Sequence, residues 1–160
     1  MIENPLQPRP RASRIIGIDY GMARLGIALS DEQKIIATPL LTLTAEKKTV
    51  ATAAKLAIEL KKHAEANRYD IAEIIIGLPL MMSGKKGMLA DEVVHFIELL
   101  KQHLLVPIHT WDERLTSVQA ERSLRESSLT RKRRSKVIDT VAATIILQSY
   151  LDSKSNSFSY

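Results

Sequence analysis

Short apolar runs open the regular part of the chain and predict three strands. The runs at residues 14–19 and 25–30 flank a turn-forming stretch with Gly21, so we expect them to pair as an antiparallel hairpin. A third run, at residues 35–43, is rich in Ile, Thr and Leu. Because Pro39 lacks the backbone N–H that a central strand must donate, this strand is expected at an edge of the sheet or to end early.

Longer segments with helical spacing follow, separated by two further apolar runs. Between residues 51 and 67, apolar residues recur every three or four positions and charged residues fill the other face, which predicts a helix. The run at residues 72–77 is continuously apolar, as expected of a central strand covered on both faces. The remaining predicted elements are helices at residues 88–105, 117–126 and 135–151 and a strand at residues 106–111.

The order of these elements, βββαβαβαα, predicts the fold class. It indicates an α/β fold with a five-stranded mixed sheet, in which the first three strands are antiparallel, flanked by helices. Parallel crossovers are expected in the second half of the chain. We expect one domain over residues 14–151, with flexible tails at residues 1–13 and 152–160, because one end is rich in proline and the other in serine.

The composition is that of an ordinary globular protein. The chain has 160 residues, of which 45% are hydrophobic and 26% charged, so it can bury a substantial core. No apolar run approaches the roughly 18 residues that a membrane helix needs. The N-terminal residues 1–15 contain no apolar segment typical of a secretory signal. We therefore expect a cytoplasmic protein with no membrane partner.

Basic residues are concentrated at one place. The formal net charge is +5, and five basic residues fall within one short stretch: Arg131, Lys132, Arg133, Arg134 and Lys136. Such a run is either a solvated surface loop or a contact for a polyanion. Since aromatic residues make up only 4% of the chain, a polyanion contact would be mostly to phosphates and not to stacked bases.

Carboxylates near strand ends are the candidate chemistry. The chain has no cysteine, which excludes disulfides, zinc–thiolate sites and cysteine nucleophiles, and its four histidines show no ligand spacing. Asp19 ends the first predicted strand, Asp112 and Glu113 follow the last, and Asp139 lies in an apolar helix. Each has a structural explanation when taken alone. Asp19 could form a turn, Asp112 or Glu113 could pair with Arg114 or begin a helix, and Asp139 could interact with a helix dipole.

Together these acids indicate a metal centre. Two carboxylates about 4 Å apart repel by roughly 1 kcal/mol in water and by about 4 kcal/mol at an effective dielectric constant near 20. A cluster of three therefore requires a compensating cation or raised pKa values. Oxygen ligands without thiolates suit Mg²⁺ or Mn²⁺, and a two-ion site of this kind is typical of phosphodiester hydrolysis.

Four blocks of the chain share a known pattern. The blocks are Gly17-Ile18-Asp19-Tyr20-Gly21 with Arg24, Gly26 and Ala28; Ile76-Gly77-Leu78-Pro79-Leu80; Asp112-Glu113-Arg114-Leu115-Thr116; and Lys136-Val137-Ile138-Asp139 followed by Ala142-Ala143 and Ile146-Leu147. In this order and spacing they resemble the YqgF family, whose members are also called Holliday-junction-resolvase-like proteins or pre-16S ribosomal RNA nucleases. The resemblance covers about residues 14–151.

The resemblance implies a ribonuclease H-like fold and an acidic centre for two Mg²⁺ or Mn²⁺ ions. Matched position by position, the catalytic and metal-binding residues would be Asp19, Glu113 and Asp139, with Asp112 as an alternative or additional metal ligand. The implied function is hydrolysis of a phosphodiester during maturation of the 5′ end of pre-16S ribosomal RNA, in ribosome biogenesis. The alternative within the family is resolution of four-way DNA junctions.

The chain departs from related enzymes after the fourth strand. Holliday junction resolvases place an acidic residue at the end of that strand, where this chain has Gly77-Leu78-Pro79, and Met81 and Ser83 stand where many relatives have Asn and Asp. The lysines that follow make this loop a candidate phosphate contact. The full set of expected nucleic-acid contacts is Arg24, Lys85, Lys86, Arg114, Arg131, Lys132, Arg133, Arg134 and Lys136.

Other interpretations fit parts of the pattern. A non-catalytic RNA-binding module of ribosome assembly would explain the missing acid of the fourth strand. An actin-like ATPase fragment would explain the turn after Asp19, but 160 residues leave no room for a second nucleotide-binding lobe. RNA is the expected partner and branched DNA the alternative, with the oligomeric state left open. Two local questions also stay open: whether Gly77 and Gly84 serve close approach or tight turning, and whether Trp111 packs the sheet or stacks on a base.

Overall fold

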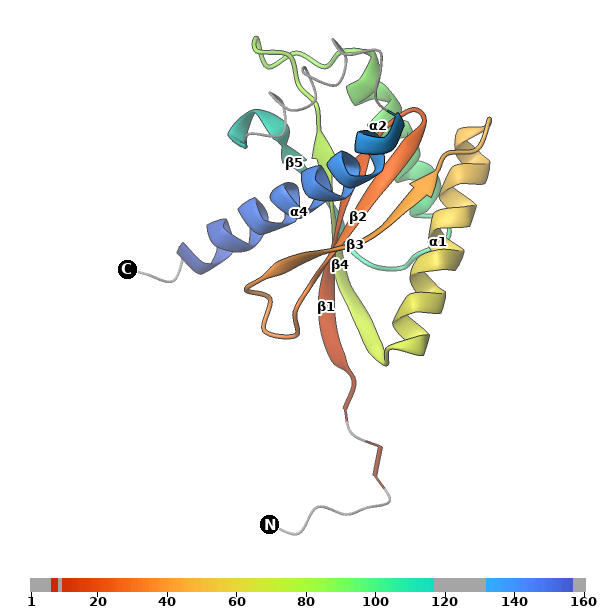
Figure 1. Cartoon of the computed structure of the whole chain (residues 1–160), viewed down its shortest axis with the longest axis vertical. Coiled ribbons are helices and arrows are strands. Elements are labelled where there is room, and N and C mark those ends of the chain that lie inside the picture. Colours follow the sequence, from red (N-terminus) through yellow and green to blue (C-terminus); the bar gives the residue numbers. More distant parts are fainter. Residues whose placement is uncertain (1–6, 9, 117–131, 157–160) are drawn as a thin grey trace.

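A five-stranded mixed sheet forms the centre of the computed structural model, which describes residues 7–8, 10–116 and 132–156 (Figure 1). The strands are β1 (Ala12–Tyr20), β2 (Arg24–Ser30), β3 (Ala37–Thr44), β4 (Tyr69–Leu78) and β5 (Ile108–Asp112), in the order β3-β2-β1-β4-β5. The pairs β1–β2 and β2–β3 are antiparallel, and β4 runs parallel to both β1 and β5. The carboxyl ends of β1, β4 and β5 therefore lie at the same edge of the sheet.

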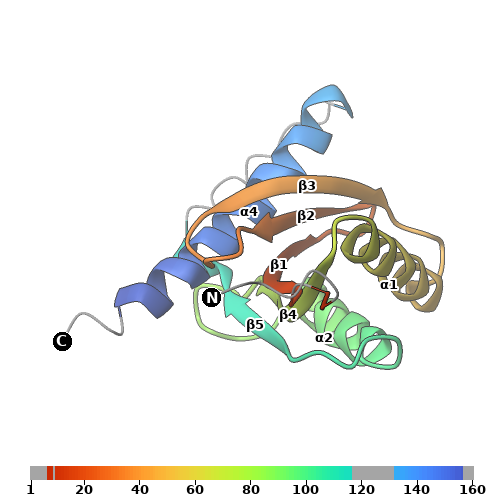
Figure 2. The same ribbon diagram turned by 90° about the horizontal axis from the view of Figure 1, so that it is seen from below.

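Helices cover both faces of this sheet (Figure 2). α1 (Thr49–Ala66) and α2 (Met88–Leu100) lie on one face, and α4 (Lys132–Asn156) crosses the other; the side chains of α4 are described for residues 140–155. A short 3-10 helix, η1 (Glu113–Leu115), follows β5 directly. Among the described residues, no helix has the length and apolar character needed to cross a membrane.

The two central strands contribute to two separate apolar cores. In β1, Ile16 belongs to the core beneath α1 and α2, whereas Ile15 belongs to the core beneath α4. In β4, Ile74 and Ile75 divide in the same way. Because both faces of these strands are covered, their sequences are apolar without the alternation of a half-exposed strand. The continuous apolar run of β4 thus has the cause expected from the sequence.

The predicted hairpin and the edge position of the third strand are confirmed. β3 lies at one edge of the sheet, and its pairing with β2 shifts register where Ile27 faces Leu41 and Ala28 faces Pro39. Leu40 is therefore an extra residue on β3, and the strand is bulged there. An edge position with a bulge accommodates Pro39, because no ladder hydrogen bond is required from its nitrogen.

The second predicted helix, at residues 88–105, is wrong at its end. α2 stops at Leu100, and the backbone N–H groups of His103 and Leu104 both donate to the carbonyl of Leu100, at 3.0 and 3.2 Å. Leu104 extends the helical pattern in the sequence, but a tight turn buries it instead. An apolar residue can thus continue a helical period without belonging to the helix.

The boundaries of the last helix also differ from the prediction of 135–151. α4 begins at Lys132 and continues to Asn156, so Lys132, Arg133 and Arg134 are helical and not in a loop, and residues 152–156 are not a tail. Lysine and arginine are strong helix formers, and no glycine or proline interrupts residues 132–156. At the other end, β1 already begins at Ala12, inside the predicted N-terminal tail, because Ala12 pairs with Tyr69. The predicted helix at 117–126 and Arg131 lie outside the described residues.

Candidate active site

Two buried carboxylates mark the carboxyl edge of the sheet. Asp19 is the penultimate residue of β1 and is 1% exposed, and Glu113 is the first residue of η1 and is 0% exposed. Acidic side chains are almost never buried to this degree unless a charge or hydrogen bond compensates them. Their burial at the ends of parallel strands distinguishes them from the exposed acids of the surface.

Both carboxylates lie on the face of the sheet that α4 covers. A Cβ atom on Gly17 would be 2.6 Å from Cβ of Leu147 in α4, so Gly17 faces this helix, and strand alternation places Asp19 on the same face. A Cβ atom on Gly77 would be 2.6 Å from Oε1 of Glu113 and 2.6 Å from Cδ1 of Ile146. The carboxylate of Glu113 therefore lies directly over the backbone of Gly77, beside α4.

The strand register places Gly77 between the two acids. Ile18 of β1 pairs with Ile76 of β4, so the residues that follow them, Asp19 and Gly77, are neighbours across the two strands. On the other side, Gly77 pairs with Trp111 of β5, from which the chain reaches Glu113 two residues later. At the end of β4, where related resolvases have an acid, this protein has Gly77, and the carboxylate of Glu113 lies over it. Glycine at this position provides the space that the side chain of Glu113 occupies.

Both carboxylate oxygens of Asp112 are engaged by a neighbouring arginine. Its Oδ1 accepts hydrogen bonds from the backbone N–H and from Nε of Arg114, both at 3.0 Å. Its Oδ2 accepts from Nε at 3.0 Å and from Nη2 at 2.6 Å. These bonds with Arg114 hold the pKa of Asp112 below its usual value. Asp112 therefore caps η1 and braces the turn that carries Glu113.

Two hydroxyl groups, of Tyr20 and Thr49, bind one carboxylate oxygen of Glu92 and fix the end of β1; the sequence did not predict this clamp. The Tyr20 hydroxyl donates to Oε1 of Glu92 at 3.1 Å, and Oγ1 of Thr49 donates to the same oxygen at 2.6 Å. Burial, together with the nearby charge of Glu92, raises the pKa of Tyr20 to about 12. The clamp joins β1 to α1 and α2 one residue beyond Asp19. Residues so far apart in the chain carry no common local signal.

The expected nucleic-acid contacts are spread around this edge. Arg24 begins β2 and is partly buried, while Lys85 and Lys86 are exposed between β4 and α2. Arg114 is exposed on η1, and its Nη1 lies 3.4 Å from where Gly84 would carry a Cβ atom. Gly84 itself has a φ of +84°, so its role is a tight turn.

The remaining predicted residues belong to the start of α4. Lys132, Arg133, Arg134, Lys136 and Asp139 all lie within this helix, ahead of the residues whose side chains are described. Asp139 is seven residues after the helix begins. Because dipole stabilisation falls off within the first turn, it does not explain an acid at this place.

Trp111 packs within the protein. Its ring meets the ring of Tyr150 of α4 edge-on, with centroids 5.8 Å apart and an angle of 83° between the planes. This resolves the question left open by the sequence, because the contact joins the end of β5 to α4. Tyr150 also donates from its hydroxyl to Oε1 of Glu73 at 2.7 Å, which ties the same helix to β4.

Comparison with known proteins identifies the family. A family model described as "RuvX: Holliday junction resolvase" matches residues 13–153. The chain belongs to the RuvX family. The resemblance to the YqgF family is thereby confirmed, and the match spans β1, where Asp19 lies, the Glu113 turn and α4.

Several proteins similar to this RuvX family member carry the name "Putative pre-16S rRNA nuclease". One from Protochlamydia amoebophila is 60% identical over 149 residues, which cover 93% of this chain and 99% of that protein. Another from Clostridium acetobutylicum is 44% identical over 140 residues, covering 88% of this chain and 98% of that protein. The similarity therefore extends over almost the full length of both relatives.

Solved structures support the ribonuclease H-like fold of this RuvX family member. RuvC of Thermus thermophilus, in complex with a Holliday junction substrate, matches with a TM-score of 0.55 over 91% of this chain and 97% of that chain. A second structure of the same resolvase gives a TM-score of 0.54. Sequence identity is only 12% in both cases, so the likeness concerns the fold.

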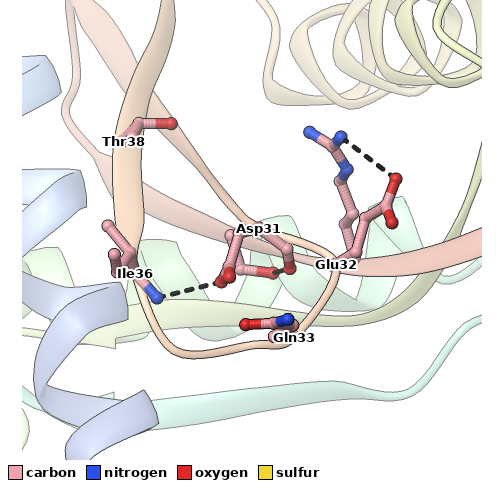
Figure 3. A pocket seen from close by; sticks show the side chains of 7 residues that line it. Asp31, Glu32, Gln33, Ile36 and Thr38 are labelled. Carbon is pink, nitrogen blue, oxygen red and sulfur yellow. Dashed lines mark hydrogen bonds and ion pairs between the residues drawn. The ribbon is translucent and has the colours of Figure 1, made fainter.

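A pocket at the opposite end of the sheet is separate from this edge (Figure 3). Asp31 accepts hydrogen bonds there from the backbone N–H groups of Ile36 and Ile35, at 2.9 and 2.7 Å, which lower its pKa. Arg14 pairs with Glu32 at 3.8 Å. These polar groups hold the turn between β2 and β3 and include no predicted site residue. The pocket is lined by Arg14, Ser30, Asp31, Glu32, Gln33, Ile36 and Thr38.

Proposed function

We propose that this protein is a divalent-metal-dependent phosphodiester hydrolase that processes the 5′ end of pre-16S ribosomal RNA. The observation that carries the proposal is the burial of Asp19 and Glu113 on one face of the carboxyl edge of the sheet. In open sheets with helical crossovers, ligands bind at this edge. The burial of two acids at this edge is better explained by a cation-binding site than by a purely structural role.

The residues at this edge fit Mg²⁺ or Mn²⁺. The donors are carboxylate oxygens, which these hard cations prefer, and Gly77 leaves the space that Glu113 occupies. Within the described residues, no group of three or more His, Cys, Asp or Glu side chains forms a metal site. A third carboxylate ligand for the ions would therefore have to come from outside this set, and α4 is the element that packs beside Asp19 and Glu113. If two such ions were held there, they would supply Lewis-acid chemistry: a lower pKa for an attacking water and stabilisation of charge on the leaving oxygen.

Asp139 is the proposed third ligand. Ala143 of α4 lies against Gly17 of β1, and Ile146 lies against Gly77 of β4. Asp139 precedes these residues by four and by seven positions, which is the spacing of one helical stripe. A carboxylate at this place in the stripe would approach the edge of the sheet where Asp19 lies, one residue before the end of β1.

The other residues have supporting roles in this mechanism. Asp19 and Glu113 would hold the ions, and the ion pair of Asp112 with Arg114 holds the turn on which Glu113 lies. Lys85 and Lys86 bind backbone phosphates, as do the basic residues at the start of α4.

The RNA assignment rests on relatedness. The relative that is 60% identical over 149 residues, 93% of this chain, carries the name "Putative pre-16S rRNA nuclease". A protein so similar over almost its full length is expected to act on the same class of substrate. The family description and the fold of RuvC favour a second candidate, the resolution of four-way DNA junctions.

The test is cleavage of an end-labelled precursor RNA that spans the 5′ end of 16S RNA. We expect cleavage with Mg²⁺ or Mn²⁺, none with chelator, and slower or no cutting of a four-way DNA junction. Asp19→Asn should abolish cleavage without unfolding the protein, whereas Asp70→Asn, an exposed acid at the other end of the sheet, should not. Undiminished cleavage by folded Asp19→Asn would refute the proposed centre. RNA binding without any cleavage by the parent protein would instead favour the non-catalytic module.

A further inference from the structure

The segment between β4 and α2 presents exposed methionines beside the candidate active site. Apart from Met1 and Met22, the methionines of the chain all fall within residues 81–88. Met81, Met82 and Met88 are 55%, 82% and 92% exposed. Large apolar side chains scattered singly on a surface need no explanation, but a cluster of them on a soluble protein marks a binding surface.

This segment is an ordered hairpin. Leu80 and Lys86 form an isolated antiparallel bridge, and the N–H of Met81 donates to the carbonyl of Lys85 at 3.0 Å. The N–H of Gly84 donates to the carbonyl of Met81 at 2.8 Å, which closes the tip. Backbone hydrogen bonds therefore fix the turn that carries Met81 and Met82, and Met88 follows it as the first residue of α2.

The hairpin adjoins the turn that carries Glu113. Gly84 at its tip lies against Nη1 of Arg114, and the neighbouring Leu115 is 66% exposed. In Figure 1 the hairpin lies beyond the carboxyl end of β4, at the top of the view. A polymer that reached Asp19 and Glu113 along this edge would pass over it.

The chemistry of the hairpin combines apolar and cationic groups. Residues 79–88 contain Lys85 and Lys86 and no acidic residue. Lysines suit phosphates, while flexible and polarisable methionine side chains adapt to flat apolar surfaces of varied shape. Nucleobases present such surfaces only when they are not paired and stacked in a duplex.

We infer that the hairpin of residues 80–86, with Met88 and Leu115, binds unpaired nucleobases, so that the protein selects single-stranded nucleic acid over duplex next to the site of cleavage. This inference rests on the proposed function for its choice of ligand. Charge complementarity favours a nucleic acid over a protein partner, because both lysines are exposed within the same turn as the methionines. The lysines hold the phosphates and the methionines contact the bases.

The test measures binding in chelator, where cleavage does not occur. The probes are a fluorescent single-stranded RNA of about ten nucleotides, the length range of single-strand sites, and the duplex of the same sequence. Met81→Ser combined with Met82→Ser should weaken binding of the single strand by roughly tenfold and leave duplex binding unchanged, since only unpaired bases can make the apolar contact. The matched control is Ile58→Ser on α1, a residue 54% exposed, which should change neither affinity.

The outcomes separate this inference from the proposed nuclease. An equal loss for single strand and duplex would show that the methionines do not select unpaired bases and would overturn the inference. No loss for either would overturn it too, and would point to a protein partner for the hairpin. If the parent protein cleaves RNA but the methionine variant binds the single strand like the parent, the inference fails and the nuclease stands. If the parent protein does not cleave but shows methionine-dependent selection of single strands, the nuclease fails and the inference stands.

Discussion

The carboxylate of Glu113 occupies the space in which any other residue at position 77 would place its side chain. A Cβ atom on Gly77 would be 2.6 Å from Oε1 of Glu113 and equally close to Cδ1 of Ile146. One glycine in β4 thus determines both where an acid of η1 lies and how closely α4 approaches the sheet. Because β4 ends without an acid and has Gly77 there instead, the side chain of Glu113 has room to be buried.

Gly77→Ala tests this relationship directly. The added methyl group must displace Glu113 or α4, and overpacking of this kind lowers the free energy of unfolding by about 1–3 kcal/mol. We expect RNA cleavage to fall sharply, because the displaced carboxylate is a proposed metal ligand. Urea unfolding and the cleavage assay measure the two effects.

Gly87→Ala is the control for that substitution. A Cβ atom at Gly87 would meet only Cγ of Met81, at 3.9 Å, which is an ordinary contact. Because Gly87 is the N-cap of α2, alanine there should lower the free energy of unfolding by no more than about 1 kcal/mol, and activity should be kept. If Gly77→Ala behaved like Gly87→Ala, the close approach of Glu113 to the backbone of β4 would have no functional importance.

Glu113 and Asp112 should differ in metal binding. Glu113→Gln removes a proposed ligand, so we expect binding of Mn²⁺ to become undetectable by calorimetry. Asp112→Asn removes only the brace that Arg114 provides, and substitutions of such supporting residues weaken metal binding by roughly 10- to 100-fold. The reverse order of effects would make Asp112 the ligand and Glu113 a core residue.

The ion pair of Asp112 with Arg114 makes a pH-dependent contribution to stability. Hydrogen bonds from Arg114 lower the pKa of Asp112 in the folded protein below the ordinary value of 3.8. The unfolded chain therefore binds a proton more readily, so the contribution is complete well above pH 3.8 and is lost as the pH falls through the lowered value. The free energies of unfolding of the parent and of Asp112→Asn should differ at pH 6 and converge at acid pH. A difference that stays constant down to pH 3 would show that the charge of Asp112 is unimportant.

The basic start of α4 should account for much of the salt dependence of RNA binding. If Lys132, Arg133, Arg134 and Lys136 each neutralise one phosphate, replacing all of them with glutamine should reduce the slope of log affinity against log salt by about 3 on single strands. Glutamine keeps the helix propensity of this segment. Replacing the exposed Lys61 and Lys62 of α1 with glutamine is the control, and it should leave the slope unchanged. If the α4 variant and the parent protein had the same slope, the start of α4 would not be part of the RNA-binding surface.

Much of the fold follows from local patterns. The hairpin of β1 and β2, the edge position of β3 and the central position of β4 were all predicted, because apolar period and the missing N–H of Pro39 act within a few residues. Helix ends were less predictable. Leu104 continues the period of α2 but is buried by a turn, and the basic residues of α4 are helical although their charge suggested a loop.

Some residues of the candidate site could likewise be predicted from local sequence, and others could not. Asp19 and the Asp112-Glu113 pair could be found from the sequence, since each follows an apolar run that ends at the carboxyl edge of a sheet. The sequence could not tell which of Asp112 and Glu113 is buried, because that depends on the Arg114 side chain, which engages Asp112, and on the Gly77 backbone, which leaves space for Glu113. The exposure of Met81 and Met82 likewise had no local signal, as methionine is equally common in cores.

The sequence by itself determined the order of strands and helices, the set of acids available for a metal site and the relatedness to the RuvX family, because all three are properties of residue types and their spacing. Only the tertiary structure decided which acids are buried, which acid is braced by an arginine and which apolar residues are exposed near the carboxyl edge of the sheet. These are decided by contacts between residues such as Gly77 and Ile146, which are far apart in the chain, and burial depends on such contacts and not on the neighbours in sequence.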